Sequence, residues 1–401
     1  MPRQSHPNCS CYKTYSTQCK VESICMPDIA PMCHICIFIP SLRGGGAERV
    51  MVMLANGFAE RGHRVDLVLT SAEGPYLSEV AKRVRIVDLG KRRVLASLLP
   101  LARYLRRERP DAMLSALNYA NIIAILARKL ARTHPRLVVS ERSSLSRITP
   151  GMAYRIIRFL MGKLYPTADR VVAVSQDMAG ELVSELSLPP DQVVAIPNPV
   201  DIASLQALSR DRPDHAWFEP GQPPVFLAVG RLDTIKDYPT LLAALSMLRK
   251  HREARLIILG EGAERANLEQ IIARLDLMDA VDLAGFKDNP FGWMASCNAF
   301  VLSSRYEGFP NVLVQAMACG ARVISTDCPT GPAEILEHGK WGQLVPVGNT
   351  EAMAMAMADT LDEAESRDTR RVVAKYRLDL ITSKYERVLV PSLAQDVPTR
   401  K

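Results

Sequence analysis

Short apolar runs rich in β-branched residues alternate with longer segments of helical periodicity from residue 34 onward. This alternation is typical of a parallel sheet that is covered by helices on both faces. The first half of the chain contains seven predicted strands, at His34–Ile39, Arg64–Leu69, Val84–Val87, Ala112–Ser115, Arg136–Val139, Arg170–Val174 and Val193–Ile196. Helices are predicted between them, near Ala47–Ala59, Leu95–Arg107, Ala120–Arg132 and Arg155–Leu164.

A second series of the same kind follows a segment that cannot be a helix interior, Pro197–Asp201, because its two prolines remove backbone donors. The predicted strands of this series are Val225–Val229, Arg255–Leu259, Val281–Ala284, Ala299–Leu302, Arg322–Ile324 and Gln343–Val345. The chain of 401 residues is also longer than a domain with a single hydrophobic core usually is. We therefore expect an α/β protein with two Rossmann-like, doubly wound parallel-sheet domains, residues 33–200 and 201–370, facing each other across a cleft. Ligands should bind at the carboxyl ends of the strands.

Residues 1–32 lack periodicity and the order of a signal peptide, so we expect a disordered extension, and Met32 is a candidate translation start. Six of the nine cysteines lie at positions 9 to 36, but their spacings do not give paired zinc-binding units. The remaining three, Cys297, Cys319 and Cys328, fit reduced thiols. No uninterrupted apolar run approaches the roughly 18 residues that span a bilayer, so we expect a soluble, cytoplasmic protein. Peripheral contact with the inner face of the membrane is compatible with this expectation.

The net charge of +7 is unevenly distributed. Residues 33–200 carry 24 Lys and Arg against 14 Asp and Glu, whereas residues 201–401 carry 23 against 27. A basic first half indicates an anionic partner, which would be a phosphate-bearing substrate or an anionic membrane surface, although solvated surface charge explains it equally. No nucleic-acid partner is expected.

The segment Lys91–Pro110 concentrates this charge, with seven cations and one acid. Its apolar residues stand at helical spacing: Leu95, Leu98, Leu99, Ala102 and Leu105. The stripe could lie on a membrane surface or pack on the sheet, and the pattern alone favours neither.

Three loops after predicted strands carry candidate chemistry. The first contains Gly44, Gly45 and Gly46 before a helix, where backbone N–H groups can approach a ligand oxygen, although a plain tight turn has the same composition. The second contains Arg231 and Lys236 around the start of the helix that follows Val225–Val229. Two cations there suit a diphosphate. Without a bound anion, the positive charge of Lys236 would be unfavourable at a helix N-terminus, because the helix dipole is positive there.

The third loop precedes another predicted helix, with Gly308 for a sharp turn, Pro310 in the first helical turn and Gly320 as a stop. Backbone amides near Phe309, Pro310, Asn311 and Val312 would face the cleft. Glu307 stands just before them, and Gln315 follows two helical turns later. A carboxylate in this place could also be a simple helix cap.

Taken together, these residues resemble the retaining nucleotide-sugar glycosyltransferases of family 4, or group 1, which have the GT-B fold. The resemblance covers about residues 34–390 and is carried by four motifs, Gly44–Arg49, Gly230–Leu232 with Lys236, Gly260–Gly262 and Glu307–Gly320. It implies that Arg231 and Lys236 bind the donor diphosphate, and that Glu307 faces the transferred sugar. It also implies that a helix near Leu378–Leu389, within residues 371–401, crosses back to brace the first domain.

Two positions depart from the family pattern. Gln315 stands where a second glutamate is usual and where the ribose hydroxyls are expected, and glutamine can still donate and accept there. Members that transfer N-acetylhexosamines to lipid-linked saccharides look most similar in the first half and tend to have Ser-Glu-His, where this chain has Ser140, Glu141 and Arg142. Either Arg142 replaces the histidine by binding phosphate, or the role of the histidine lies elsewhere in this chain.

The resemblance implies transfer, with retention of configuration, from a UDP-linked or other nucleotide diphosphate sugar to a saccharide or lipid-linked saccharide, as in cell-surface polysaccharide or lipopolysaccharide synthesis. We expect no cofactor and no metal, because arginine and lysine would stabilise the leaving phosphate and no Asp-x-Asp cluster occurs. Two alternatives stay open on the same fold: a nucleotide-sugar 2-epimerase and a catalytically silent nucleotide-sugar-binding protein. A dinucleotide-dependent dehydrogenase fits less well, because the glycine spacing differs.

Overall fold

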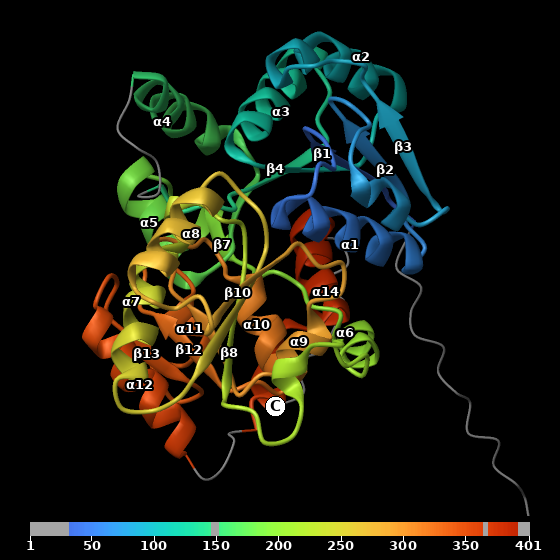
Figure 1. Ribbon diagram of the computed structural model, residues 1–401. Coiled ribbons are helices and arrows are strands. Elements are labelled where there is room, and N and C mark those ends of the chain that lie inside the picture. The colour runs from blue at the N-terminus through green and yellow to red at the C-terminus, as the bar shows by residue number, and fades with distance from the viewer. Residues whose placement is uncertain (1–31, 146–151, 364–367, 392–401) are drawn as a thin grey trace, which may run out of the picture. The chain divides into compact units, whose positions relative to one another are not determined.

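The computed structural model describes residues 32–145, 152–363 and 368–391 (Figure 1). The expected disordered extension therefore lies, apart from Met32, outside the described residues. Two open sheets, one of seven strands and one of six, follow each other along the chain. The strands within each sheet are all parallel, as expected from their short, predominantly apolar sequences.

The first sheet has the strand order β3-β2-β1-β4-β5-β6-β7. Its strands are β1 (His34–Ile39), β2 (Arg64–Leu69), β3 (Val84–Asp88), β4 (Ala112–Ala116), β5 (Arg136–Ser140), β6 (Arg170–Ala173) and β7 (Val193–Ala195). One face is covered by α2 (Leu98–Glu108), α3 (Asn118–Ala131), α4 (Met152–Leu164) and α5 (Gln176–Leu186). The other face is covered by α1 (Gly46–Glu60) and by α14 (Leu378–Leu389), the last helix of the described chain (Figure 1).

The second sheet has the strand order β10-β9-β8-β11-β12-β13. Its strands are β8 (Val225–Val229), β9 (Arg255–Leu259), β10 (Val281–Gly285), β11 (Ala299–Leu302), β12 (Val323–Thr326) and β13 (Gln343–Val345). On one face lie α7 (Tyr238–Arg249), α8 (Arg265–Arg274) and α12 (Thr350–Asp362). Helices α9 (Phe291–Ser296) and α10 (Asn311–Ala318) lie on the other, and the short helices α6 (Ile202–Leu208), α11 (Pro332–Ile335) and α13 (Arg370–Val373) complete the domain.

The predicted fold class is confirmed, and each of the thirteen predicted strands is present within two residues of its expected bounds. The helices show three differences. Lys236 belongs to a 3₁₀ turn, Thr234–Lys236, and α7 begins only at Tyr238, so Lys236 does not enter the start of that helix as expected. Helix α4 begins three residues before its expected start. The predicted helix Leu95–Arg107 is divided into a 3₁₀ turn, Val94–Ser97, and α2.

The apolar stripe of that segment divides between core and surface. Leu101, Ala102, Tyr104 and Leu105 are buried in the core of the first sheet, whereas Leu95 and Leu99 are exposed. Packing on the sheet therefore explains the apolar face of α2. Within this segment, only the 3₁₀ turn before α2 and the first residues of α2 present apolar side chains to solvent.

Helix α14 packs on α1, although more than 300 residues separate them in sequence. The Glu386 carboxylate accepts hydrogen bonds from Arg61 Nη1 at 3.1 Å and pairs with His63 Nε2 at 2.7 Å. A Cβ on Gly57 would stand 2.8 Å from Thr382 Oγ1, so the two helices approach closely at a glycine. Within the described residues, no helix is both long and apolar enough to cross a bilayer.

Candidate functional site

The centre of the candidate site is an ion pair between the loops that follow β8 and β11. Lys236 Nζ donates to Glu307 Oε1 at 2.7 Å, and both side chains are less than one-fifth exposed. The buried Ser304 hydroxyl donates to the same carboxylate oxygen at 2.7 Å. Two of the predicted catalytic residues are thus brought into direct contact at the carboxyl ends of neighbouring strands.

Asp233 fixes the loop that presents the two predicted phosphate-binding cations. Its carboxylate accepts the backbone N–H groups of Ile235 at 3.1 Å and Lys236 at 3.2 Å, and it lies 3.4 Å from Arg231 Nε. The Arg231 side chain is 71% exposed. The same loop therefore carries a largely solvated cation, Arg231, and a mostly buried one, Lys236, an arrangement that suits a diphosphate.

The turn at Gly308 lies directly against the first domain. A Cβ on Gly308 would stand 2.2 Å from the backbone oxygen of Arg142, so only glycine fits there without displacement of the backbone. This contact joins the loop after β11 to the loop after β5. Thr330 also holds the turn at Gly308 in place, because its hydroxyl donates a hydrogen bond to the backbone carbonyl oxygen of Glu307.

The glycine loop of the first domain also reaches the second. Gly45 is the N-cap residue of α1 and has no side chain of its own to cap the amides of the first turn, although the Glu48 carboxylate lies close to it. A Cβ on Gly46 would stand 3.1 Å from Asn311 Nδ2, at the start of α10. The starts of α1 and α10 therefore lie close together, and both offer backbone N–H groups to an anion.

Arg142 lies in a buried hydrogen-bonded chain that links both domains. Its guanidinium donates to Asn198 Oδ1 and, at 3.1 Å, to the Tyr385 hydroxyl of α14. Asn198 Nδ2 in turn donates to Asn311 Oδ1 at 2.8 Å. Both ends of the guanidinium are thus engaged by protein groups, and the role of Arg142 in binding phosphate stays a prediction.

Glu141, the neighbour of Arg142, is a buried carboxyl group. It accepts hydrogen bonds from the Tyr165 hydroxyl and from Asn121 Nδ2, the latter at 3.0 Å. Burial raises the pKa of Glu141 to about 7, because these hydrogen bonds only partly compensate the loss of hydration.

The remaining predicted residues lie along α10 and before it. Phe309 is buried and packs edge-to-face against Tyr376 with ring centroids 5.4 Å apart, so only its backbone is available to a ligand. Pro310 is the N-cap residue of α10, and Val312 packs against the core. Gln315 is partly exposed and lies only about one turn along the same helix, not two helical turns after Glu307 as expected, because α10 begins at Asn311 and Glu307 lies in the loop before it. Their binding roles stay predictions.

A cavity of about 420 Å³ opens beside this site. It is lined from the first domain by Ser144, Asp177 and Glu181, and from the second by Asp327, Cys328, Pro329, Thr330 and Ala333. Three carboxylates in the lining disfavour a diphosphate there. Phosphate groups should therefore bind on the side of Arg231 and Lys236, and the cavity suits a neutral, hydroxyl-rich group.

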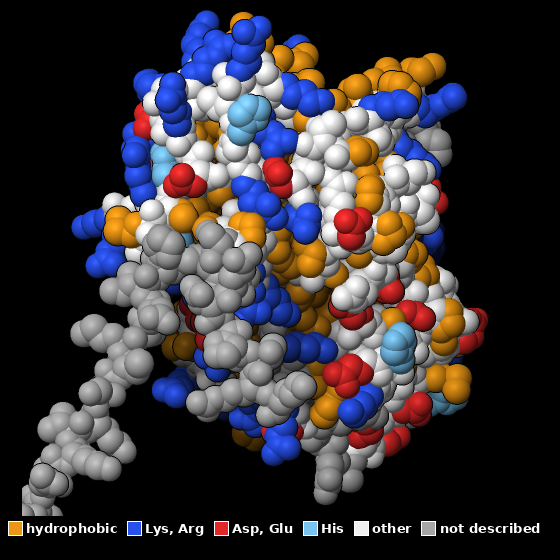
Figure 2. Space-filling view, turned by 180° about the vertical axis from the view of Figure 1, so that it is seen from behind, with side chains coloured by type: hydrophobic (Ala, Val, Ile, Leu, Met, Phe, Trp, Pro, Cys, Tyr) orange, Lys and Arg blue, Asp and Glu red, His pale blue; other side chains and the backbone are white. Residues whose placement is uncertain are grey.

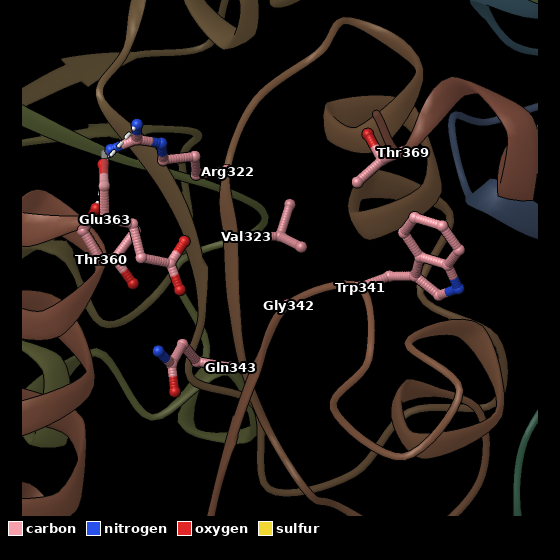
Figure 3. Close-up of a pocket in the computed structure, with 8 residues that line it drawn as sticks. All are labelled: Arg322, Val323, Trp341, Gly342, Gln343, Thr360, Glu363 and Thr369. Atoms are coloured by element: carbon pink, nitrogen blue, oxygen red, sulfur yellow. Dashed lines mark hydrogen bonds between the residues drawn. The ribbon is translucent and has the colours of Figure 1, made fainter. Parts of the chain in front are cut away.

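A second pocket, of about 10 Å³, lies at the other end of β12 (Figure 3). Arg322 closes it by donating to the carbonyl oxygens of Thr360 and Glu363, each at 2.8 Å. Its volume admits about one water molecule, so it is a packing defect remote from the candidate site. Within the described residues, no group of three or more His, Cys, Asp or Glu side chains could hold a metal ion.

Three residues of the site were not predicted: Ser304, Asp233 and Asn198. Ser304 and Asp233 stand within three residues of Glu307 and Lys236, so proximity in sequence was their only signal. Asn198 lies in the predicted linker between two prolines. Nothing in that segment indicated that its side chain joins the two domains.

Comparison with known proteins identifies the family. Residues 209–376 match the model of "Glycosyl transferases group 1", and residues 44–204 match that of "Glycosyltransferase Family 4". The chain is 30% identical over 362 residues to the N-acetylgalactosamine-N,N'-diacetylbacillosaminyl-diphospho-undecaprenol 4-alpha-N-acetylgalactosaminyltransferase of Campylobacter jejuni, covering 85% of this chain and 93% of that protein. It is 27% identical to the lipopolysaccharide core biosynthesis glycosyltransferase LpsE of Rhizobium meliloti, covering 86% and 96%.

Solved structures show the same fold. Alr3699/HepE of Anabaena, solved with UDP and glucose, gives a TM-score of 0.75 at 21% identity and covers 90% of this chain and 100% of that chain. A glycosyltransferase of Rickettsia africae gives 0.75 at 17% identity and covers 92% and 100%. The two parallel sheets, the paired Lys236 and Glu307, and these matches agree: the chain belongs to the group 1 and family 4 glycosyltransferases and has the GT-B fold.

Proposed function

We propose that the protein transfers a sugar from a UDP-linked donor to a lipid-linked saccharide, with retention of anomeric configuration. The observation that carries the proposal is the Lys236–Glu307 pair beside Arg231 at the carboxyl ends of β8 and β11. The basic first domain and the relatives that act in lipid-linked and lipopolysaccharide synthesis support the choice of acceptor. Alr3699/HepE, which binds UDP, supports the nucleotide.

The donor diphosphate would lie between Arg231, Lys236 and the N-terminal amides of α1 and α10. Lys236 then shares its ammonium group between Glu307 and a phosphate oxygen. Gln315, further along α10, would reach the ribose hydroxyls. Glu307, held by Ser304, would face the transferred sugar and keep Lys236 oriented before the donor arrives.

The reaction is a front-face displacement. The acceptor hydroxyl oxygen forms a bond to the anomeric carbon while the bond from that carbon to the β-phosphate oxygen breaks, and the acceptor proton passes to the departing phosphate. Arg231, Lys236 and the helix amides stabilise the negative charge that develops on this phosphate. No second carboxylate is required as a nucleophile, in contrast to the two-step retaining glycosidases. No cofactor enters this scheme.

Two substitutions test the placement of the donor. Glu307→Gln keeps the shape of the side chain but removes its charge, so turnover with a full UDP-sugar should fall by about 10² or more, while UDP alone binds nearly as tightly. Gln315→Ala should weaken UDP binding by about 0.5 to 1.5 kcal/mol, the net contribution of a neutral hydrogen bond. Calorimetric titration of UDP, together with donor turnover rates, measures both.

The opposite pattern would place the two residues at the wrong ends of the donor: loss of UDP binding in Glu307→Gln, with Gln315→Ala unchanged. A 2-epimerase would invert C2 of the donor sugar without any acceptor, whether the product stays linked to UDP or not, and a silent binding protein would bind UDP-sugar without turnover. Following UDP release with and without a lipid-linked acceptor, together with the configuration of the sugar after incubation without acceptor, therefore separates the three candidate functions.

A further inference from the structure

Arg142 is a buried cation where the two domains meet. Figure 2 shows Lys and Arg side chains spread over the surface of the upper part of the molecule, where Figure 1 places the first domain. Arg142 differs from these cations, because it is only 8% exposed and its Nε atom is buried with no hydrogen-bond partner among the described residues. Burying a guanidinium is unfavourable unless its donors are bonded, so its remaining hydrogen bonds must offset this cost.

Each end of the Arg142 guanidinium binds one of the two connections between the domains. Nη1 donates to Asn198 Oδ1, in the segment that leads from the first domain into the second. Nη2 donates at 3.1 Å to the hydroxyl of Tyr385, in the helix that follows the return to the first domain. The two connections also pair with each other, through a parallel bridge between Val200 and Arg377. Arg142 therefore lies where the chain enters and leaves the second domain.

The hydrogen bond to Asn198 continues to the start of α10. Asn198 Nδ2 donates to Asn311 Oδ1 at 2.8 Å. Asn311 is the first residue of α10, so its backbone N–H group has no intrahelical acceptor and is available to an anion. A Cβ on Gly46, at the start of α1, would stand 3.1 Å from Asn311 Nδ2. The orientation of the Asn311 side chain therefore determines how closely the starts of α1 and α10 approach each other.

The backbone of Arg142 contacts the same loop at a second point. A Cβ on Gly308 would stand 2.2 Å from the Arg142 carbonyl oxygen, and Gly308 directly follows Glu307. Arg142 thus reaches the loop after β11 twice, at Gly308 through its backbone and at Asn311 through Asn198. A shift of Arg142 would displace the Glu307 carboxylate and the first amide of α10 together.

We propose that Arg142 is a positioning residue, which holds the start of α10 against the start of α1 through Asn198 and does not contact the donor itself. Nη1 and Nη2 are bonded to neutral side chains and Nε is buried, so a phosphate could reach the guanidinium only by breaking these bonds. Arginine suits this role because its planar fork holds two acceptors in fixed directions, whereas lysine is a single point charge. The proposal rests on the proposed function only in taking the ligand between the two helices to be a diphosphate.

The first test is the binding of UDP to variants of the full chain, measured by calorimetry. Arg142→Met removes the fork, and Asn198→Ala keeps the arginine charge but removes the connection to α10. Each should raise the Kd of UDP about three- to tenfold, the effect of losing one hydrogen bond to the diphosphate, and the double variant should bind no more weakly than Arg142→Met. Arg142→Lys, which keeps the charge, should not restore the affinity.

Arg136→Met is the matched control. Arg136 lies at the opposite end of β5, and its Nε atom donates at 2.6 Å to the Val388 carbonyl oxygen of α14. The substitution therefore also loosens α14 from the first domain, but remote from α10. It should lower Tm and leave the Kd of UDP within about twofold.

The second test needs no ligand. Without UDP, the amides of residues 311–318 should exchange with deuterium about tenfold faster in Arg142→Met and Asn198→Ala than in the unmodified protein, and at an unchanged rate in Arg136→Met. If Arg142→Met fails to fold, Asn198→Ala decides both tests.

Full UDP affinity in Asn198→Ala, or additive losses in the double variant, would show that Arg142 itself binds the phosphate and would overturn the proposal. Unchanged exchange of α10 in Asn198→Ala would overturn it as well. An unmodified protein that bound no UDP would instead refute the proposed function, and the exchange rates would still decide the role of Arg142.

Discussion

Glu141 should make the stability of the first domain fall as the pH rises. Its carboxyl group is 2% exposed, and burial raises its pKa from 4.5 in the unfolded chain to about 7 in the fold. The folded state then holds a proton that the unfolded state has released, so the free energy of unfolding decreases between these two pKa values. Integrating over pH 5 to 8 gives a loss of about 2 to 3 kcal/mol.

The substitution Glu141→Gln removes this titration and keeps an amide that can accept from Tyr165. Relative to the unmodified protein, the variant should gain those roughly 2 to 3 kcal/mol between pH 5 and pH 8, which corresponds to several degrees in Tm for a domain of this size. Thermal unfolding followed by circular dichroism at several pH values measures the difference. Glu253→Gln, at an exposed position, serves as the matched control and should show no such trend.

A difference in Tm between Glu141→Gln and the unmodified protein that stayed constant from pH 5 to pH 8 would refute the reasoning. It would mean that the hydrogen bonds from Tyr165 and Asn121 fully offset the burial of the charge. The fold would then hold an ionised carboxylate next to Arg142, and the electrostatics of the loop after β5 would have to be reconsidered.

Two further predictions concern the site directly. Arg231→Ala and Lys236→Ala should each reduce donor turnover by about 10² or more, because each removes a charge from the leaving phosphate; steady-state rates close to those of the unmodified protein would exclude the diphosphate assignment. Gly308→Ala should lower both Tm and turnover, since its Cβ would stand 2.2 Å from the Arg142 carbonyl oxygen, whereas Gly180→Ala, with no atom within 4 Å, should be tolerated. Comparable melting curves for the two alanine variants would contradict the close approach.

The strands were predictable because a parallel strand buried on both faces must be a short apolar run, and the chain contains such runs at regular intervals. Helix α5 was harder to predict. It begins at Gln176 after the cap residue Ser175, and only three of its residues, Met178, Leu182 and Leu186, are buried. A narrow apolar face of this kind gives a weak periodic signal.

Within the site, sequence identified residues that stand near glycines at strand ends, such as Glu307 and Lys236. It could not identify partners that are remote in sequence. Arg142 is held by Asn198 and Tyr385, and nothing in the local pattern around any of the three shows that they meet. The stripe at Leu95–Leu105 illustrates a related limit, because helical periodicity marks an apolar face without showing whether protein or solvent covers it.

The packing of α14 on α1 also has a consequence for synthesis of the chain on the ribosome. The strands of the first sheet are complete once Ala195 has emerged, but Ile381, Tyr385 and Leu389, which cover one face of that domain, follow much later. At 5 to 20 residues per second the delay is about 10 to 40 s. During that time α1 has an uncovered apolar face, so the first domain begins to fold first and is completed last, and a nascent chain stalled before Leu378 would be a substrate for chaperones.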